Sequence, residues 1–288
     1  MSEPVEARLA ATVLLARDGA DGLELFMVVR HHQIDFASGA LVFPGGSVDK
    51  SDRDPRLRQL SEGAEDASDD MFAVMVGAAR EAFEECGVLL ARTSRGGSLV
   101  DGERARGLGV AYRAALEADE IGMADIMEKE GLVLALDRLT HFAHWITPPH
   151  MPKRFDTHFF LTEAPSDHAL AHDGHESVDS VWITPKDACD EADAGKRTVI
   201  FPTRLNIEKV GRSRTVAEAV SAARSAPVVK VLPTSEKVEG GRIMRIPIEA
   251  GYGAAELFVE GKPGKAARIR YPDGTERDTS VAMQLKPE

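Results

Sequence analysis

Apolar residues follow two different spacings along this chain, and each spacing predicts a different kind of element. Residues 11–19 and 23–30 are strand-like apolar runs on either side of a Gly-Ala-Asp-Gly turn, so they predict a β-hairpin. From Ser68 to Gly87 the larger apolar residues instead cluster on one side of a helix. Ser68 suits the N-cap of that helix and Gly87 is a natural C-terminal stop. The pattern therefore predicts a strand pair followed by a long, half-buried helix.

The middle of the chain returns first to helical and then to strand-like spacing. Residues 101–140 contain two amphipathic pieces and predict a helical insertion packed on the core. Aromatic and β-branched residues, broken by prolines and polar loops, then predict three strands in residues 140–149, 154–164 and 177–185. A capping box at residues 215–218 opens a further helix. This mixture of strands and helices indicates an α/β fold.

The C-terminal part of the chain has a different sequence pattern from the rest. Residues 227–288 contain apolar stretches joined by turns and predict a β-meander, to which we assign no chemistry. We expect residues 1–226 to form the main domain, with insertions at about 50–68 and 101–140, and residues 227–288 to form a β-rich extension. Residues 50–66 have few large apolar side chains, so we expect a mobile surface excursion that can be shortened at little cost in stability.

Composition and charge narrow the class of protein. The 288 residues are 43% hydrophobic, which suffices for one large domain with an appendage. The sequence has no run of about eighteen apolar residues and no signal-peptide layout, so we expect no membrane partner. Cys86 and Cys189 suggest no disulfide framework, which agrees with a reducing compartment, and we expect a cytoplasmic protein. The net charge of −12 argues against a nucleic-acid partner, and it requires a metal or a local basic patch to attract an anionic substrate. The oligomeric state is open, with a homodimer as one option.

Three glutamates gather at the C-terminal end of the predicted long helix. Glu81, Glu84 and Glu85 stand at i, i+3 and i+4, so their carboxylates share one face of the helix. These carboxylates repel one another, and the helix dipole further disfavours anions at this end. Because Arg80 alone cannot neutralise three carboxylates, the cluster predicts a bound divalent cation. Carboxylate oxygens are typical ligands of Mg²⁺ and Mn²⁺.

The same stretch carries a resemblance to a known family. The sequence REAFEECGV at residues 80–88 is similar to the second half of the Nudix box, G-x5-E-x7-R-E-U-x-E-E-x-G-U, in which U is aliphatic. Taking Gly46 of the FPGG stretch as the box glycine, 33 residues separate it from Arg80, about 20 more than in the family pattern. The first glutamate of the box, which supports the arginine, is therefore missing from its place. The candidates to replace it are Asp52, Asp69 and Asp70.

An interrupted box resembles the branch of Nudix hydrolases related to the peroxisomal coenzyme A diphosphatase. The stretches FASGALVFPGG, HWITPP, PKRFDTHFFL and FPTRL also occur in the order that this branch shows. Of the coenzyme A signature, Arg30 and Gly39 are present, whereas Asp35 stands where the signature has an arginine. The resemblance implies an α/β/α Nudix sandwich that hydrolyses a diphosphate linkage, with coenzyme A or acyl-coenzyme A as the leading small-molecule substrate.

The resemblance also implies roles for individual residues. Glu81, Glu84 and Glu85 become metal ligands together with the backbone carbonyl of Gly46, and Arg80 becomes a catalytic residue. Glu176, six residues before a late tryptophan, is the candidate base or extra ligand, with Asp179 as the alternate. Gly39 belongs to the substrate-binding set, and the cations suited to phosphate contacts are Arg30, Lys153, Arg154 and Arg204.

Two other functions compete with hydrolysis of coenzyme A. A Nudix pyrophosphatase acting on ADP-ribose, NADH or oxidised nucleotides would use the same metal cluster. A catalytically silent Nudix-fold module that senses a nucleotide would have no need of a complete cluster, so the intact glutamates argue against it.

Overall fold

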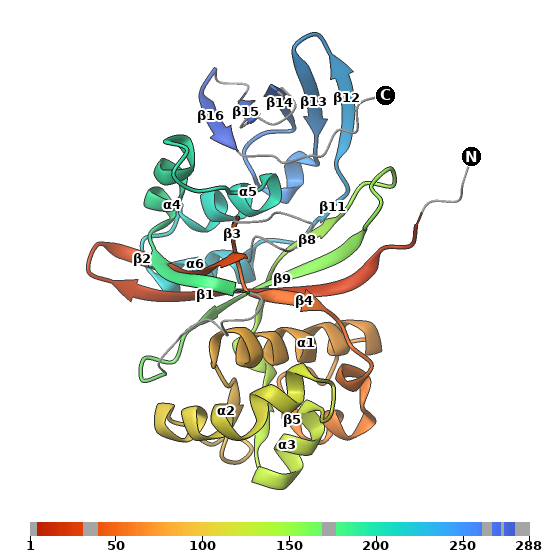
Figure 1. Ribbon diagram of the computed structural model, residues 1–288, viewed down its shortest axis with the longest axis vertical. Helices are drawn as coiled ribbons and strands as arrows, with labels where there is room; N and C mark the ends of the chain where they lie inside the picture. The colour runs from red at the N-terminus through yellow and green to blue at the C-terminus, as the bar shows by residue number, and fades with distance from the viewer. Residues whose placement is uncertain (1–4, 31–39, 169–176, 261–266, 272–273, 280–288) are drawn as a thin grey trace.

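A mixed β-sheet runs through the centre of the molecule, which we describe from a computed structural model covering residues 5–30, 40–168, 177–260, 267–271 and 274–279 (Figure 1). Within these residues the main sheet has eight strands, in the order β10-β2-β1-β9-β8-β11, with β3 paired to β2 and β4 paired to β1. The strands are β1 (Arg8–Gly19), β2 (Gly22–Arg30), β3 (Leu41–Val42), β4 (Gly45–Ser47), β8 (Thr140–Ile146), β9 (Phe155–Glu163), β10 (Ser177–Ile183) and β11 (Lys230–Val231). The predicted hairpin is confirmed as β1 and β2, and the three later strands as β8, β9 and β10.

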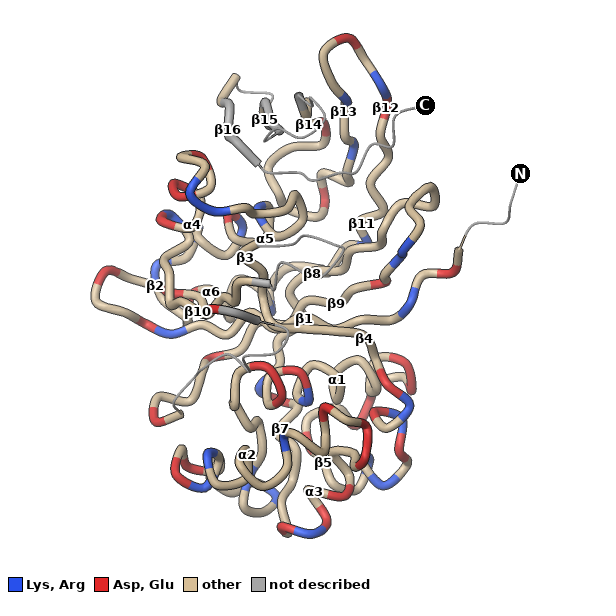
Figure 2. Tube along the Cα trace, in the orientation of Figure 1, with Lys and Arg blue, Asp and Glu red and all other residues tan. Residues whose placement is uncertain are grey.

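Helices cover both faces of this sheet, so the predicted α/β/α sandwich is confirmed (Figure 1). On one face lie α1 (Asp69–Cys86), α2 (Gly102–Glu117) and α3 (Met123–Glu130), and on the other α4 (Pro185–Asp193), α5 (Phe201–Val210) and α6 (Val216–Ser225). Each face has its own hydrophobic core. Acidic positions gather around α1 and α3, whereas the central strands carry few charges (Figure 2).

The long helix α1 begins and ends where its sequence predicts. The hydroxyl of Ser68 accepts a hydrogen bond from the Met71 N–H at 3.3 Å, which caps the N-terminus. Gly87 adopts a left-handed conformation with φ of 72°, which glycine tolerates best, and its N–H bonds back to the last turn. Because the sheet covers one side of α1 and the 101–140 insertion packs on the other, the helix is buried along almost its whole length, including its charged end.

The expectation of a mobile surface excursion at residues 50–66 is wrong. The segment forms two 3₁₀ turns, η1 (Ser51–Arg53) and η2 (Pro55–Arg58), and strand β5 (Ser61–Glu62). Strand β5 pairs with β7 (Val133–Ala135), which also pairs with β6 (Ala91–Arg92) and leads into the 3₁₀ turn η3 (Leu136–Arg138). Leu57 is fully buried in the core beside α1, and Asp52 is 1% exposed. Ser61 and Ala64 are buried as well, and these four buried residues, at positions 52, 57, 61 and 64, are two polar and two apolar, so they form no apolar period that a sequence pattern could reveal.

The C-terminal extension is the predicted β-meander, with one difference. Its sheet contains β12 (Thr234–Val238), β13 (Gly241–Arg245), β14 (Glu256–Glu260), β15 (Ala267–Arg270) and β16 (Glu276–Thr279), with the turn η4 (Ile248–Ala250) between β13 and β14. Strand β11, however, joins the main sheet beside β8 instead of the meander. The Tyr252 hydroxyl accepts from the Trp145 ring N–H at 2.7 Å and donates to Asn206 at 2.8 Å. The extension thus shares a core with the main sheet, and the domain boundary at residue 226 stays a prediction.

Among the described residues, no helix combines the length and the hydropathy that crossing a membrane requires.

We expect Leu57→Ala to lower the free energy of unfolding by about 3 kcal/mol, because it removes fully buried methyl groups and leaves a cavity beside α1. Denaturant unfolding would measure the change, with Leu232→Ala as the matched control. Leu232 is 41% exposed, so its truncation should cost under about 1 kcal/mol. If both substitutions changed the free energy of unfolding by the same small amount, residues 50–66 would be a loose surface excursion after all.

Candidate active site

The glutamate cluster of α1 lies against the start of β4. Glu81, Glu84 and Glu85 are each 8% exposed. The Gly45 N–H donates a hydrogen bond to Glu85 Oε2 at 3.0 Å. A Cβ atom at Gly46 would collide with the Glu81 carboxylate, so a glycine is what lets the β4 backbone approach this close. The helix end and the FPGG stretch, which are far apart in sequence, therefore form one surface.

Arg80 sits at the centre of the cluster and is itself 4% exposed. Its Nη1 donates to Glu81 Oε1 at 2.9 Å and to Glu84 Oε2 at 2.6 Å. Its Nη2 donates to the Ser47 carbonyl at 2.9 Å, which ties the guanidinium to β4. One arginine thus orients two of the glutamates and the strand that faces them.

Asp52 supplies the carboxylate that the interrupted motif lacks. Its Oδ1 accepts from Arg80 Nε at 3.0 Å and its Oδ2 from Arg80 Nη2 at 3.1 Å, a bidentate pair. The Asp49 N–H donates to Asp52 Oδ2 at 2.8 Å and fixes the carboxylate in turn. The other two candidates lie at the surface, where Asp69 pairs with Arg58 and Asp70 with Arg53. Among the three candidates, Asp52 is therefore the residue that supports Arg80.

Burial makes the carboxylates of the metal-free protein hard to ionise. Desolvation is the largest cause that raises the pKa of Glu81 to about 8 and that of Glu84 to about 7, although Arg80 acts in the opposite direction. Burial also raises the pKa of Asp52. Three buried carboxylates around one arginine leave a shortage of positive charge. Oxygen donors in this arrangement fit a hard divalent cation such as Mg²⁺ or Mn²⁺.

One contact at the C-terminal end of α1 could not be predicted from the sequence. Arg113 of α2 donates a hydrogen bond to the backbone carbonyl of Glu84. A cation at this position offsets the partial negative charge of the α1 C-terminus. Because Arg113 follows Glu84 by 29 residues and lies in the helical insertion, neither spacing nor periodicity connects the two. The insertion therefore contributes to the site as well as to the fold.

The carboxylates open onto a cavity of about 790 Å³, a size in the range of small-molecule sites. Strand β1 contributes Thr12 to its wall, and the loop between β8 and β9 contributes Lys153. The C-terminal extension contributes Pro233, Ser235 and Met244, although its sequence gave no functional signal. Large apolar side chains form much of the remaining wall: Phe43, Trp145, Phe155, Phe159 and Phe201.

The predicted phosphate-binding cations are not all brought to this cavity. Lys153 lines it, whereas Arg154 donates to the carbonyls of Thr147 and Val5 and lies outside the lining. The prediction that Arg204 contacts a phosphate is wrong. Its side chain is fully buried and pairs with Asp193 and Glu208 within the helical layer of α4 and α5.

The remaining predicted residues are only partly described. Gly39 and Glu176 lie outside the described residues, and so does the side chain of Arg30, whose backbone ends β2. Asp179, the alternate to Glu176, is exposed on β10, where its carboxylate accepts from the Ser180 N–H at 2.8 Å. It does not line the cavity.

Comparisons with known proteins show which family this chain resembles. Residues 59–207 match the family model described as the NUDT19 Nudix domain. The Caenorhabditis elegans protein "Putative nudix hydrolase 7" is 30% identical over 205 residues, which cover 71% of this chain and 61% of that protein. The crystal structure of a NUDIX hydrolase from Alicyclobacillus acidocaldarius is similar with a TM-score of 0.61 and 27% identity, over 75% of this chain and 96% of that one.

The raised pKa values predict how stability depends on pH once divalent ions are removed by a chelator. Glu81 and Glu84 bind protons more tightly in the folded than in the unfolded state, so their contribution is fully present below pH 4.5 and is lost as pH rises through 7 to 8. Thermal unfolding of wild type and Glu84→Gln, compared at each pH over this window, isolates the effect. The variant should gain stability relative to wild type as pH rises. A constant difference between the two proteins would show that Glu84 ionises normally.

Proposed function

This chain belongs to the Nudix hydrolase family, and on that premise we propose that it hydrolyses a diphosphate linkage in a nucleoside diphosphate derivative with the help of Mg²⁺ or Mn²⁺. The observation that carries the proposal is the buried cluster of Glu81, Glu84 and Glu85 around Arg80, at the wall of a cavity large enough for such a substrate. A silent ligand-sensing module has no need of this cluster, because its three buried carboxylates only add desolvation cost and repulsion to the free protein.

The residues of the cluster have distinct tasks in this proposal. Glu81, Glu84 and Glu85 would hold the metal, with the Gly46 carbonyl beside them as the expected backbone ligand. A bound Mg²⁺ or Mn²⁺ supplies a Lewis acid that lowers the pKa of a water and neutralises charge on the phosphate oxygens. Arg80 positions Glu81 and Glu84 through its hydrogen bonds, and Gly45 does the same for Glu85.

Two further residues complete the proposal. Lys153 lies at the cavity wall, where its ammonium group can contact a phosphate as a point charge. Glu176 stays our candidate to accept the proton of the attacking water or to act as an extra ligand. The protein needs no covalent intermediate, since the attacking oxygen comes from water and the products are two phosphomonoesters.

For the substrate, we favour coenzyme A or an acyl derivative. The matching NUDT19 family model supports this class, as does the apolar part of the cavity wall, which suits the long pantetheine and acyl portions. ADP-ribose, NADH and oxidised nucleotides are the alternative, because they present the same diphosphate to the carboxylates. The cytoplasmic location and the homodimer stay predictions.

We expect Glu85→Gln to reduce the turnover number at saturating Mg²⁺ by at least about 100-fold, because it replaces an ionised ligand with a neutral amide. A hydrolysis screen over coenzyme A, NADH, ADP-ribose and nucleoside triphosphates would identify the substrate for this measurement. Glu128→Gln is the matched control, since Glu128 is exposed, pairs with Arg56 and does not line the cavity. Near wild-type turnover in Glu85→Gln would show that the Glu85 carboxylate is not a metal ligand.

We expect intact coenzyme A to be cleaved with a higher kcat/KM than its 3′-dephospho form, and Lys153→Ala to raise KM by about tenfold through loss of a charged contact. Lys186→Ala is the control, because Lys186 is exposed on α4 and pairs with Asp190. Indifference to the 3′-phosphate, together with faster cleavage of NADH or ADP-ribose, would move the enzyme to the alternative substrate class.

A further inference from the structure

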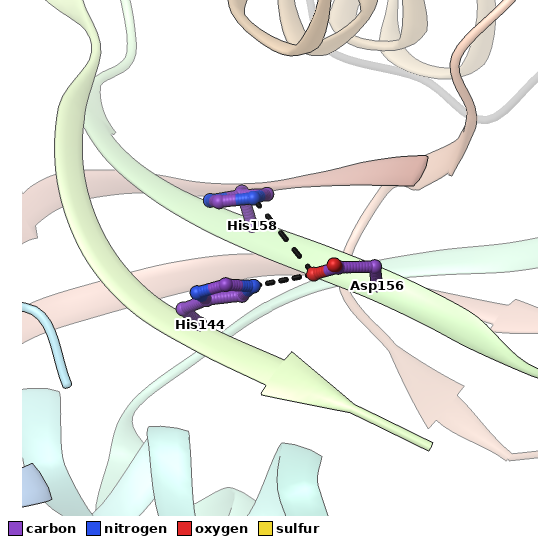
Figure 3. A group of neighbouring side chains, drawn as sticks. All are labelled: His144, Asp156 and His158. Carbon is purple, nitrogen blue, oxygen red and sulfur yellow. Dashed lines mark hydrogen bonds and ion pairs between the residues drawn. The ribbon is translucent and has the colours of Figure 1, made fainter. Parts of the chain in front are cut away.

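A group of side chains that could hold a metal ion lies on β8 and β9, outside the site described above (Figure 3). It contains His144 of β8 and Asp156 and His158 of β9, and His144 is paired directly with His158 across the two strands. The neighbouring pair, Trp145 and Thr157, lines the substrate cavity. Because side chains alternate between the faces of a sheet, the cluster points to the opposite face from that cavity wall.

The three side chains converge on one point. His144 Nε2 contacts Asp156 Oδ1, and His158 Nε2 lies 3.9 Å from the same oxygen. The two imidazole rings are stacked, with centroids 4.0 Å apart and planes 18° from parallel. The ligand atoms of all three residues lie within 4.8 Å of one another. Figure 3 shows both rings directing a nitrogen toward the carboxylate.

A fourth residue, His141, contacts one of the rings. His158 Nδ1 is 3.0 Å from His141 Nε2, so one of these two nitrogens donates a hydrogen bond to the other. In the tautomer in which His158 Nδ1 donates to His141, the His158 Nε2 lone pair faces the Asp156 carboxylate. Two electron-rich atoms then face each other, and a cation between them stabilises both.

We propose that His144, Asp156 and His158 bind a divalent transition metal of the zinc class. Two imidazole nitrogens and one carboxylate suit zinc, whereas Mg²⁺ prefers oxygen ligands alone. Two donors of a tetrahedral zinc ion lie about 3.3 Å apart. To bind the ion, His158 Nε2 must therefore move toward Asp156 Oδ1 from its present 3.9 Å, and His144 Nε2 must move away from the oxygen that it now contacts. His141 orients His158 through the ring nitrogen that does not face the metal, as ligand-supporting residues commonly do.

Strands β1 and β11 provide the neighbours of the cluster on either side. On β9 the neighbouring strand β1 places Ala11 opposite His158 and Leu9 opposite Asp156, so that side is apolar. On β8 the neighbouring strand β11 places Lys230 opposite His144, and its positive charge weakens cation binding. With three protein ligands and this opposing charge, the ion would cross-link β8 to β9 directly behind the wall formed by Trp145 and Thr157.

Co²⁺ tests the site because its visible absorption reports coordination by nitrogen ligands, independently of hydrolysis. The chelator-treated full chain would be titrated with Co²⁺ in excess Mg²⁺, which occupies the carboxylate cluster of α1. We expect one equivalent to bind with a visible band that Zn²⁺ displaces. His144→Ala and His158→Ala should each weaken binding by at least about 100-fold, and His141→Phe by about tenfold. His150→Ala, in an exposed loop, is the matched control and should bind as wild type does.

A second measurement keeps the test valid if a variant folds poorly. Thermal unfolding should show that Zn²⁺ raises the Tm of wild type but not of His144→Gln, with circular dichroism to verify that the variant is folded. Nitrogen chemical shifts of the histidines should show His158 protonated at Nδ1 and metallated at Nε2. Absence of a Co²⁺ band in folded wild-type protein, or equal binding by His144→Ala, overturns the proposal. Neither outcome bears on the hydrolase function, which uses a different set of ligands.

Discussion

The site depends on the hydrogen bonds of the Arg80 guanidinium, because they join three separate parts of the chain. The guanidinium binds two glutamates of its own helix, the carbonyl of Ser47 in β4, and Asp52 of the inserted segment. Burying this many charges is costly, and such a cluster is stable only when each donor and acceptor has a partner in good geometry. The bidentate pair with Asp52 therefore holds the arginine where it can orient the glutamates.

This constraint explains why the segments around the sandwich are parts of the site and not additions to it. The segment at residues 50–66 brings Asp52 under α1 and is anchored there by Leu57. The helical insertion brings Arg113 to the last turn of α1, and the C-terminal extension closes the cavity with Met244. The central sheet supports each face differently, with the cavity wall on one side of β8 and β9 and the histidine cluster on the other.

Features encoded by near neighbours in sequence could be predicted, and features made by distant residues could not. The ends of α1 follow from Ser68 and Gly87, and the glutamate face follows from helical spacing, because each depends on residues within one or two turns. Asp52, in contrast, is one of several acids in a charged stretch, and only the folded chain selects it. For Arg204 the sequence suggested a role that the fold does not allow. Arginine is a residue type suited to phosphate, but here Asp193 and Glu208 neutralise its charge.

We infer that the Asp52 carboxylate takes the place of the missing acid of the interrupted motif and so holds Arg80 and the glutamates in position. The most direct test is the Mg²⁺-dependent turnover number of Asp52→Asn, which has nearly the same shape but no charge. We expect a loss of at least about tenfold in folded protein, because altering a residue that supports a metal ligand typically reduces activity by this much. Asp70→Asn, which alters an exposed pair with Arg53, should retain wild-type turnover. Wild-type turnover in Asp52→Asn would show that the site does not depend on the charge of Asp52.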